Sequence, residues 1–595
     1  ALVGRGEVST RRASHIAAAS SCGTVHPFSS AVSAFSVSTM DSPVFALSDQ
    51  YIERLAELDP GFATSLGIPG RDHLMTDFSP AGHEAQETLN RQTLAALSSL
   101  DQSSDVDRLA AGVLRNSLEM AEREFAAGEH LRAIRVLAGQ VDYARAVFDL
   151  MPTDTAEQWG VIAERMSNVP QAFAGMRESW RLGMQRNVVA PRRQVLAVAD
   201  MLDGWAGSDR AAGFFPSLAE HATTVPGAPM NALREAAVRA SEALASTAEF
   251  LRNEYAPFAD PRNGVGEERH ALARQRYMGM HVDADDAYAW GLEEVRRLDD
   301  ELRKCAEQIR PGATLDEVRN HLDTSSEHSI EGEENLRKWL QDLMDQAMDF
   351  LVSNRHFTIP ESIRTIEAKI SPPGGAAAQY YMPPSEDLKR PGSTWYPANG
   401  RSRFPLWSEP TTAYHEGVPG HHLQIGMAVV NREKLSRFQR NEFVSGHGEG
   451  WALYAERLMD EFGFLERPEY RLGYLYAQAF RAARVVVDIG MHCEKTIPKD
   501  WSWHAGEAWT PELAFEFLSA RSSSDEAFNR SEIDRYLGWP AQAISYKLGE
   551  RVWLQLRDEA KARHGAAFDL RAWHTYALDL GNLGLDLFKR EMARF

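Results

Sequence analysis

The chain has 595 residues, of which 44% are hydrophobic and 25% charged, a balance typical of globular proteins and not of disordered or fibrous ones. Its formal charge of −20 argues against binding to nucleic acid or to an anionic membrane surface, because both favour basic proteins. The three cysteines are odd in number and far apart, which predicts neither a disulfide framework nor a thiolate metal site. We therefore expect a cytoplasmic protein, monomeric or homodimeric, with no nucleic-acid or membrane partner.

Residues 1–39 differ from the rest of the chain in composition. They are rich in serine and alanine, carry Arg5, Arg11 and Arg12, and contain a single acid, Glu7. Basic, acid-poor leaders of this kind resemble organellar targeting peptides, while an alternative is that the protein starts at Met40. On either interpretation we expect residues 1–39 to lie outside the fold.

Helical patterns dominate residues 48–350. The segments 107–127, 231–250 and 285–309 place apolar residues three and four positions apart with charges between them. Prolines such as Pro170 and Pro191 predict helix ends along this stretch. We expect an N-terminal helical lobe over residues 40–350.

The pattern changes between residues 357 and 405. Residues 363–370 alternate apolar and polar side chains, 379–382 are rich in aromatics and 393–396 favour a strand, with proline and glycine pairs between them. This predicts a small β-sheet, after which helical patterns resume at Pro410 and continue to the end. Residues 351–595 would form a catalytic lobe, packed with the first lobe into one compact unit of mainly α class.

The strongest chemical signal is the sequence YHEGVPGHHLQ over residues 414–424. Its three histidines supply nitrogen ligands that suit zinc, and Glu416, beside the first of them, is a candidate base. In the familiar zinc-peptidase motif, two histidines four residues apart share one helix face. Here Pro419 occupies the position four residues after His415, so a straight helix could not hold that motif.

Proline and glycine together favour a break in the helix. Looping out two residues at Pro419 and Gly420 would bring His421 to the place of the second histidine. We therefore expect His415 and His421 to bind zinc, with His422 as the alternative ligand.

A third ligand should come from a later helix. The segment 449–456 has a helical pattern and opens 28 residues after His421. Glu449 and Glu456 are seven residues apart and share a face, so one can bind the metal while the other orients a ligand. We expect Glu449 to be the ligand, with His447 as a competitor.

Two later segments are candidate walls of the site. One helical stretch is apolar except for a polar stripe, consisting of Arg481, Arg484, Asp488 and His492. Buried charges must be paired, so this stripe predicts either a salt-bridge network or a surface that binds substrate, and Asp488 and His492 are further candidates for assisting the metal ligands. Further on, phenols and polar groups that could meet an oxyanion or a carboxylate are supplied by Arg535, Tyr536, Gln542 and Tyr546.

These motifs, in this order, resemble the bacterial family called domain of unknown function 885, which is grouped with the gluzincin metallopeptidases. The similarity covers roughly residue 49 to the C-terminus. The matching segments are HExxPGHHxQ at 415–424, EGWA at 449–452, RVVVD at 484–488, PAQAxSY at 540–546, YYxPP at 380–384 and RPG at 390–392. The resemblance implies a two-lobed helical zincin fold, related to thimet oligopeptidase and carboxypeptidase Taq, with a channel between the lobes and with Tyr381 near the substrate.

The working hypothesis is a zinc-dependent hydrolase that cleaves an amide bond in short peptides or small amide-bearing molecules. Glu416 would act as general base, and Tyr546 or Arg484 would stabilise the oxyanion. Substrate contacts are expected from Tyr381, Arg481, Arg535, Tyr536 and Gln542. Two alternatives remain open: a zinc-dependent enzyme that modifies a small metabolite, and a catalytically inactive binding protein with a structural zinc.

Overall fold

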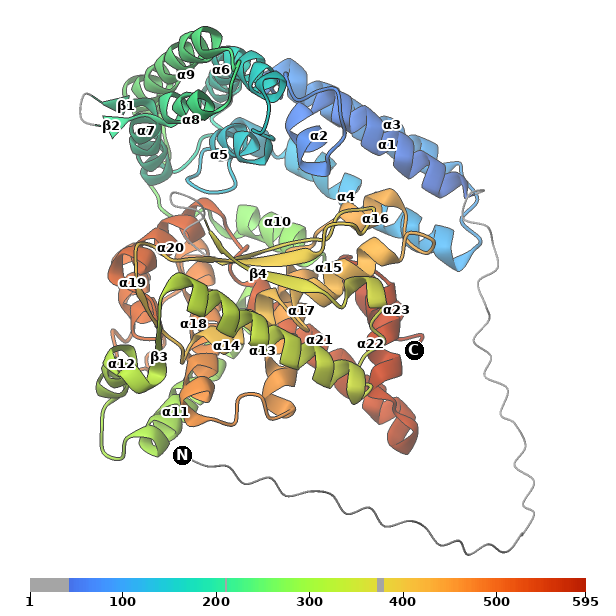
Figure 1. Ribbon diagram of the computed structural model, residues 1–595, viewed down its shortest axis with the longest axis vertical. Coiled ribbons are helices and arrows are strands. Elements are labelled where there is room, and N and C mark those ends of the chain that lie inside the picture. The colour runs from blue at the N-terminus through green and yellow to red at the C-terminus, as the bar shows by residue number, and fades with distance from the viewer. Residues whose placement is uncertain (1–41, 209–210, 372–378) are drawn as a thin grey trace, which may run out of the picture.

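The computed structural model describes residues 42–208, 211–371 and 379–595, so the predicted leader at 1–39 lies outside the described residues. As predicted, the protein is mainly helical, with few strands. Its apolar side chains gather in two separate clusters, one formed by residues between 78 and 259 and a larger one that takes in most of the remaining chain. In Figure 1 the helices of the smaller cluster lie at the top, beside the first helices of the chain.

The smaller cluster is built around one long helix, α6 (Ala156–Gln185). Its N-terminus is closed by a capping box between Thr155 and Gln158, and Trp159 and Trp180 are buried along its inner face. Pro170 lies inside this helix, so the helix end predicted there is wrong: the buried face continues across the proline, and packing outweighs the lost backbone hydrogen bond. The other helices of this part are α5 (Gln140–Ala146), α7 (Arg192–Ala206), α8 (Phe214–His221) and α9 (Met230–Phe250).

The larger cluster joins the first helices of the chain to its C-terminal half. The first helices are α1 (Pro43–Leu58), α2 (Pro60–Leu66), α3 (Pro80–Ser98) and α4 (Asp105–Ala126). Those that precede the predicted catalytic lobe are α10 (Glu267–Met278), α11 (Ala284–Ile309), α12 (Leu315–Thr324) and α13 (Glu333–Ser353). The predicted boundary between residues 350 and 351 stays a prediction, although α11 to α13 share this cluster with the helices after it.

The helices of the C-terminal half surround the candidate site. They are α14 (Glu409–Glu416), α15 (His421–Val430), α16 (Arg437–Asn441), α17 (Ser445–Glu461), α18 (Pro468–His492), α19 (Pro511–Ser519), α20 (Glu526–Gly538), α21 (Ser545–His564), α22 (Leu570–Asp579) and α23 (Leu585–Met592). Helix α17 packs along α21, and α18 packs along α11. These helices are held by buried apolar faces, such as Val485, Val486 and Val487 on α18.

The predicted small sheet is present and has three strands, β4 (Ile366–Ser371), β5 (Tyr380–Met382) and β6 (Gly392–Pro397). The central strand β6 pairs parallel with β4 and antiparallel with β5. Gln341 on α13 fixes β4 through hydrogen bonds to the backbone of Ile366 and Ala368. Two further strand pairs join β1 (Gly207–Ser208) to β2 (Ala211–Ala212) and β3 (Ser329–Glu331) to β7 (Arg403–Pro405). No helix in the described ranges is long and apolar enough to cross a membrane.

Candidate metal centre

The helix that carries the histidine motif is broken at the predicted place. Helix α14 ends at Glu416 and α15 begins at His421, with a four-residue turn between them. A side chain on Gly420 would place its Cβ 1.9 Å from the carbonyl oxygen of His415, so only glycine fits there. The turn brings the rings of His415 and His421 to a centroid distance of 5.0 Å, at 87° to each other.

Glu449 on α17 completes a cluster with these two histidines. One potential ligand atom from each residue lies within 4.8 Å of the other two. The Oε2 atom of Glu449 is 3.4 Å from Nε2 of His415 and 3.6 Å from Nε2 of His421. All three side chains are largely buried.

The donor set fits zinc. A tetrahedral ion with ligand bonds of about 2.0–2.1 Å holds neighbouring donor atoms about 3.3 Å apart, close to the two distances from Glu449. Oε2 of Glu449 is buried and has no hydrogen-bond partner among the described residues, although it lies between two imidazoles. A buried carboxylate oxygen in this state is costly unless something binds it. Two imidazoles and one carboxylate leave a fourth position open, as in catalytic zinc sites.

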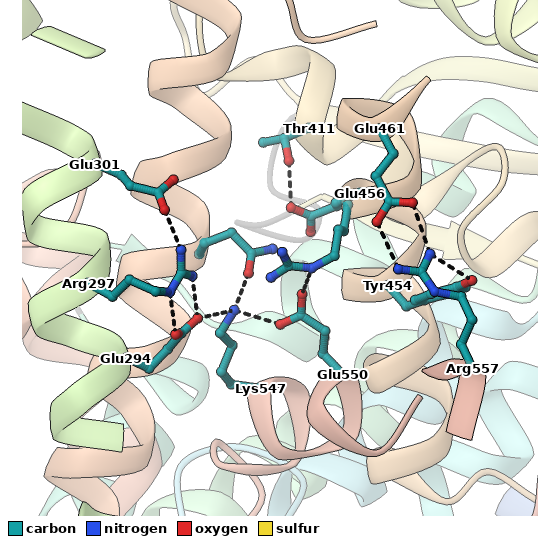
Figure 2. A network of polar contacts seen from close by, with 12 residues as sticks. Glu294, Arg297, Glu301, Thr411, Tyr454, Glu456, Glu461, Lys547, Glu550 and Arg557 are labelled. Atoms are coloured by element: carbon teal, nitrogen blue, oxygen red, sulfur yellow. Dashed lines mark hydrogen bonds and ion pairs between the residues drawn. The ribbon is translucent and has the colours of Figure 1, made fainter. Parts of the chain in front are cut away.

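Glu456, almost two turns after Glu449 along α17, orients His415. Its Oε1 is 2.8 Å from Nδ1 of His415, and its Oε2 accepts a hydrogen bond of 2.5 Å from the hydroxyl of Thr411. Figure 2 draws the contact between Glu456 and Thr411. Arg481 lies 3.7 Å from the same carboxylate. Nδ1 of His415 is thereby engaged, and Nε2 is turned toward the cluster.

The charges of the cluster are coupled. Burial lowers the pKa of His415, but the carboxylates of Glu449 and Glu456 outweigh it and raise this pKa to about 9. Burial would raise the pKa of Glu449, yet the two imidazoles hold it well below its usual range. Metal binding at this site would therefore displace a proton from His415.

Glu416 is partly exposed beside the cluster and lines the same cavity as His415 and His421. Burial raises the pKa of its carboxyl, although the imidazoles of His415 and His421 oppose this. Raised pKa values are typical of carboxyls that exchange protons with a substrate.

The structure does not bring the alternative ligand His422 to the cluster. Its Nε2 donates to the carbonyl of Ile363 at 2.7 Å, and the hydroxyl of Tyr381 donates to its Nδ1 at 3.1 Å. Both nitrogens are thus used in contacts of α15 with Ile363 and with strand β5, and burial lowers the pKa of His422 to about 4. The hydroxyl of Tyr381 is engaged in the same contact, although its side chain still lines the cavity.

The other residues that were expected to bind the metal or to assist its ligands also lie away from the cluster. Asp488 accepts a hydrogen bond from His270 at 2.7 Å and from the backbone N–H of Ala541, while His492 donates to the carbonyl of Tyr536. These two residues therefore join α18 to α10 and α20. His447 is surrounded by Trp553 and Phe588, and its Nδ1 contacts Gln424.

Replacing the two adjacent histidines separates their roles. His421→Ala should abolish zinc binding, because it removes one of three ligands. His422→Ala should keep the zinc and instead lower the free energy of unfolding by about 1–3 kcal/mol, because it leaves buried partners without hydrogen bonds. Elemental analysis and thermal unfolding of both variants test this. Zinc loss in His422→Ala with retention in His421→Ala would move the ligand by one position.

Two cavities meet at the cluster. The N-terminal-side cavity, of about 910 Å³, reaches residues of the first half of the chain such as His130 and Arg135. The sheet-side cavity, of about 1150 Å³, reaches Tyr381 and contains His415 and Glu416. The side chains common to both are Phe443, Glu449, Arg484, Phe528 and Tyr546.

Tyr546 lies beside the cluster. Its ring is stacked against that of His415, with the two centroids 6.4 Å apart, and the guanidinium carbon of Arg484 lies 4.9 Å from the centroid of the Tyr546 ring. Burial raises the pKa of Tyr546. The next residue, Lys547, is buried and bonded to Glu550 and Glu294, which fixes this end of α21 against α11 (Figure 2).

The predicted polar residues of the wall are held together by Glu532, which the sequence interpretation missed. Its carboxylate accepts hydrogen bonds from Arg484, Arg535 and Tyr536 at 2.6–2.9 Å. Arg535 also donates to Gln542 at 2.6 Å. The spacing of Glu532 from Arg535 and Tyr536, three and four residues on one helix, is the signal that could have identified it.

Comparisons with known proteins show a similar fold in two solved structures and one matching family model. No curated protein sequence matches this chain. A crystal structure described as that of a putative lipoprotein from Colwellia psychrerythraea is similar with a TM-score of 0.77 and 22% identity, over 93% of this chain and 98% of that one. A putative lipoprotein of unknown function from Shewanella oneidensis is similar with a TM-score of 0.71 and 18% identity, over 92% and 99% of the two chains. The model of the family described as "Bacterial protein of unknown function (DUF885)" matches residues 60–592, and the chain belongs to this family.

Proposed function

We propose that this protein is a zinc-dependent hydrolase that cleaves amide bonds in peptides or in small amide-bearing molecules. The observation that carries the proposal is the convergence of His415, His421 and Glu449 beside the carboxyl of Glu416, which faces the same cavity. A purely structural zinc site needs no base and no open position on a large cavity. The arrangement also supports the finer assignment of a helical zincin of the gluzincin type.

Each of the polar residues at the cavity would have its own role in the reaction. Zinc held by the three ligands would polarise the scissile carbonyl and lower the pKa of a water molecule toward about 7. Glu416 takes the proton of the attacking water and passes it to the leaving amine. Tyr546 lines the same cavity with its ring stacked on that of His415, and its hydroxyl would donate to the oxygen that gains negative charge. Glu456 holds His415 in the orientation that the metal requires.

A peptide library tests the proposal. Zinc-loaded protein should release fragments that correspond to hydrolysis, with incorporation of one oxygen from labelled water at the new carboxyl group. Turnover of a small metabolite without peptide hydrolysis would favour the alternative of an enzyme that modifies metabolites. Absence of any metal-dependent turnover would contradict the proposal and favour a binding protein.

Removing only the hydroxyl of Tyr546 tests its role. Tyr546→Phe should leave zinc content and folding nearly unchanged, because the ring and its contacts remain. Turnover should fall by about 10²–10³, the usual effect of losing one oxyanion donor. Single-turnover rates close to those of the wild type, together with a lower melting temperature, would instead assign Tyr546 to packing and leave Arg484 or Tyr536 as the donor.

The compartment remains a separate proposal. The absence of paired cysteines favours the cytoplasm, but the names of the two similar structures, putative lipoproteins, favour a location outside it. Fractionation of cells that produce the native protein decides between them: protein in the cytosolic fraction supports the first, and protein in the membrane or envelope fraction contradicts it.

A further inference from the structure

Phe443 exposes an aromatic ring at the metal centre. The side chain is 44% exposed and its ring centroid lies 6.3 Å from that of His421. Of the large apolar side chains left exposed in the described part of the chain, only Phe443 and Leu137 line either of the two cavities. An aromatic ring that stays in contact with water does not gain the free energy of apolar burial. The exposed ring of Phe443 beside a polar site therefore indicates a binding function.

The position of this ring is tied to that of a metal ligand. Phe443 lies between α16 and α17, and its neighbours are anchored: the N–H of Val444 donates to Asn582 at 2.8 Å, and the N–H of Glu442 donates to Phe438 at 2.9 Å. The ring packs on Gly448, where a Cβ atom would lie 2.4 Å from a ring carbon. Gly448 directly precedes Glu449, so the ring packs against the first turns of the helix that carries this ligand.

The metal centre lies where the two cavities join, not at the end of either. Glu449, Tyr546 and Phe443 line both cavities. A substrate that ended at the metal would leave one cavity unused, whereas an extended chain, at up to 3.3–3.6 Å per residue, would pass from one into the other. Both spaces are large enough for several residues of such a chain, since ligand pockets for small molecules commonly hold about 300–1,000 Å³.

We infer that the centre takes an internal amide bond of an extended oligopeptide, and that Phe443 forms the subsite for a large apolar side chain next to that bond. The inference rests on the proposed hydrolytic function and names its substrate class. The ring of Phe443 offers an apolar face on which an aromatic or aliphatic side chain can pack and be removed from water. A glycine or a charged residue at this position of the substrate would gain nothing from it.

The experiment uses full-length zinc-loaded protein and ten-residue peptides that are acetylated at the N-terminus and amidated at the C-terminus. Each peptide carries one test residue, phenylalanine or glycine, at its centre among small polar residues. The wild type should cleave next to phenylalanine with a kcat/KM at least about tenfold above that for glycine. Phe443→Ala should retain the zinc and lower the ratio of kcat/KM for the phenylalanine peptide to that for the glycine peptide about tenfold. Phe258→Ala is the matched control, because Phe258 is 64% exposed and lines neither cavity.

The outcomes separate this inference from the proposed function. Cleavage of peptides only when one end is unblocked, at a fixed distance from that end, overturns the internal-bond assignment. Cleavage by Phe443→Ala with the wild-type preference overturns the subsite. Failure of the wild type to cleave any peptide, blocked or free, overturns the inference, and the proposed function falls with it when no small amide-bearing molecule is hydrolysed either.

Discussion

Replacing His415 or Glu449 by alanine should abolish zinc binding. Each variant leaves only two protein ligands, and the purified proteins should contain far less than the one zinc per chain expected of the wild type. His415→Ala should also lower stability, because the buried carboxylate of Glu456 loses its partner. Elemental analysis after gel filtration measures the zinc, and circular dichroism verifies that both variants fold.

His447→Ala is the matched control for these variants. His447 is as deeply buried as His415 and lies two residues before Glu449, but its ring packs among aromatic side chains away from the cluster. It should lose stability and keep the zinc. Full zinc occupancy in His415→Ala and Glu449→Ala would show that the metal binds elsewhere.

Glu416→Gln should remove turnover while leaving the metal in place. The amide has the shape of the carboxylate but cannot accept the proton of the attacking water. Loss of a general base typically costs about 10²–10⁴ in rate. Single-turnover kinetics with a cleaved peptide, at matched zinc content, measure this effect.

Glu409→Gln provides the comparison on the same helix. Glu409 lies seven residues before Glu416 and lines the same cavity, and burial raises its pKa to about 7. It does not belong to the metal cluster, so its replacement should cost far less turnover than Glu416→Gln. Equal losses in the two variants would indicate that the cavity needs its negative charge rather than a specific base.

The local part of the site could be predicted from the sequence because local rules determine it. Proline cannot continue a helix, and Gly420 alone fits against the carbonyl of His415, so the position of the break follows from two residues. The seven-residue spacing of Glu449 and Glu456 likewise places both on one helix face. The mainly helical fold and the small sheet follow from periodicity in the same way.

Contacts between distant segments could not be predicted in this way. The members of the polar stripe on α18 have different surroundings. Arg484 lines the cavities, while Asp488 pairs with His270, which lies 218 residues earlier. Helical spacing alone cannot tell which member of a stripe meets which neighbour. No sequence pattern predicts the proposed role of Phe443, because this role depends on the packing of its ring on Gly448 and on the junction of the two cavities.

Zinc titration of the metal-free protein tests the central claim most directly. The protein is stripped with a chelator and zinc is returned in steps while peptide hydrolysis is followed. The account predicts no hydrolysis without metal and a rate that rises in proportion to bound zinc, reaching its plateau at about one ion per chain. Undiminished hydrolysis by the stripped protein, or full zinc binding without hydrolysis of any peptide or small amide, would contradict it.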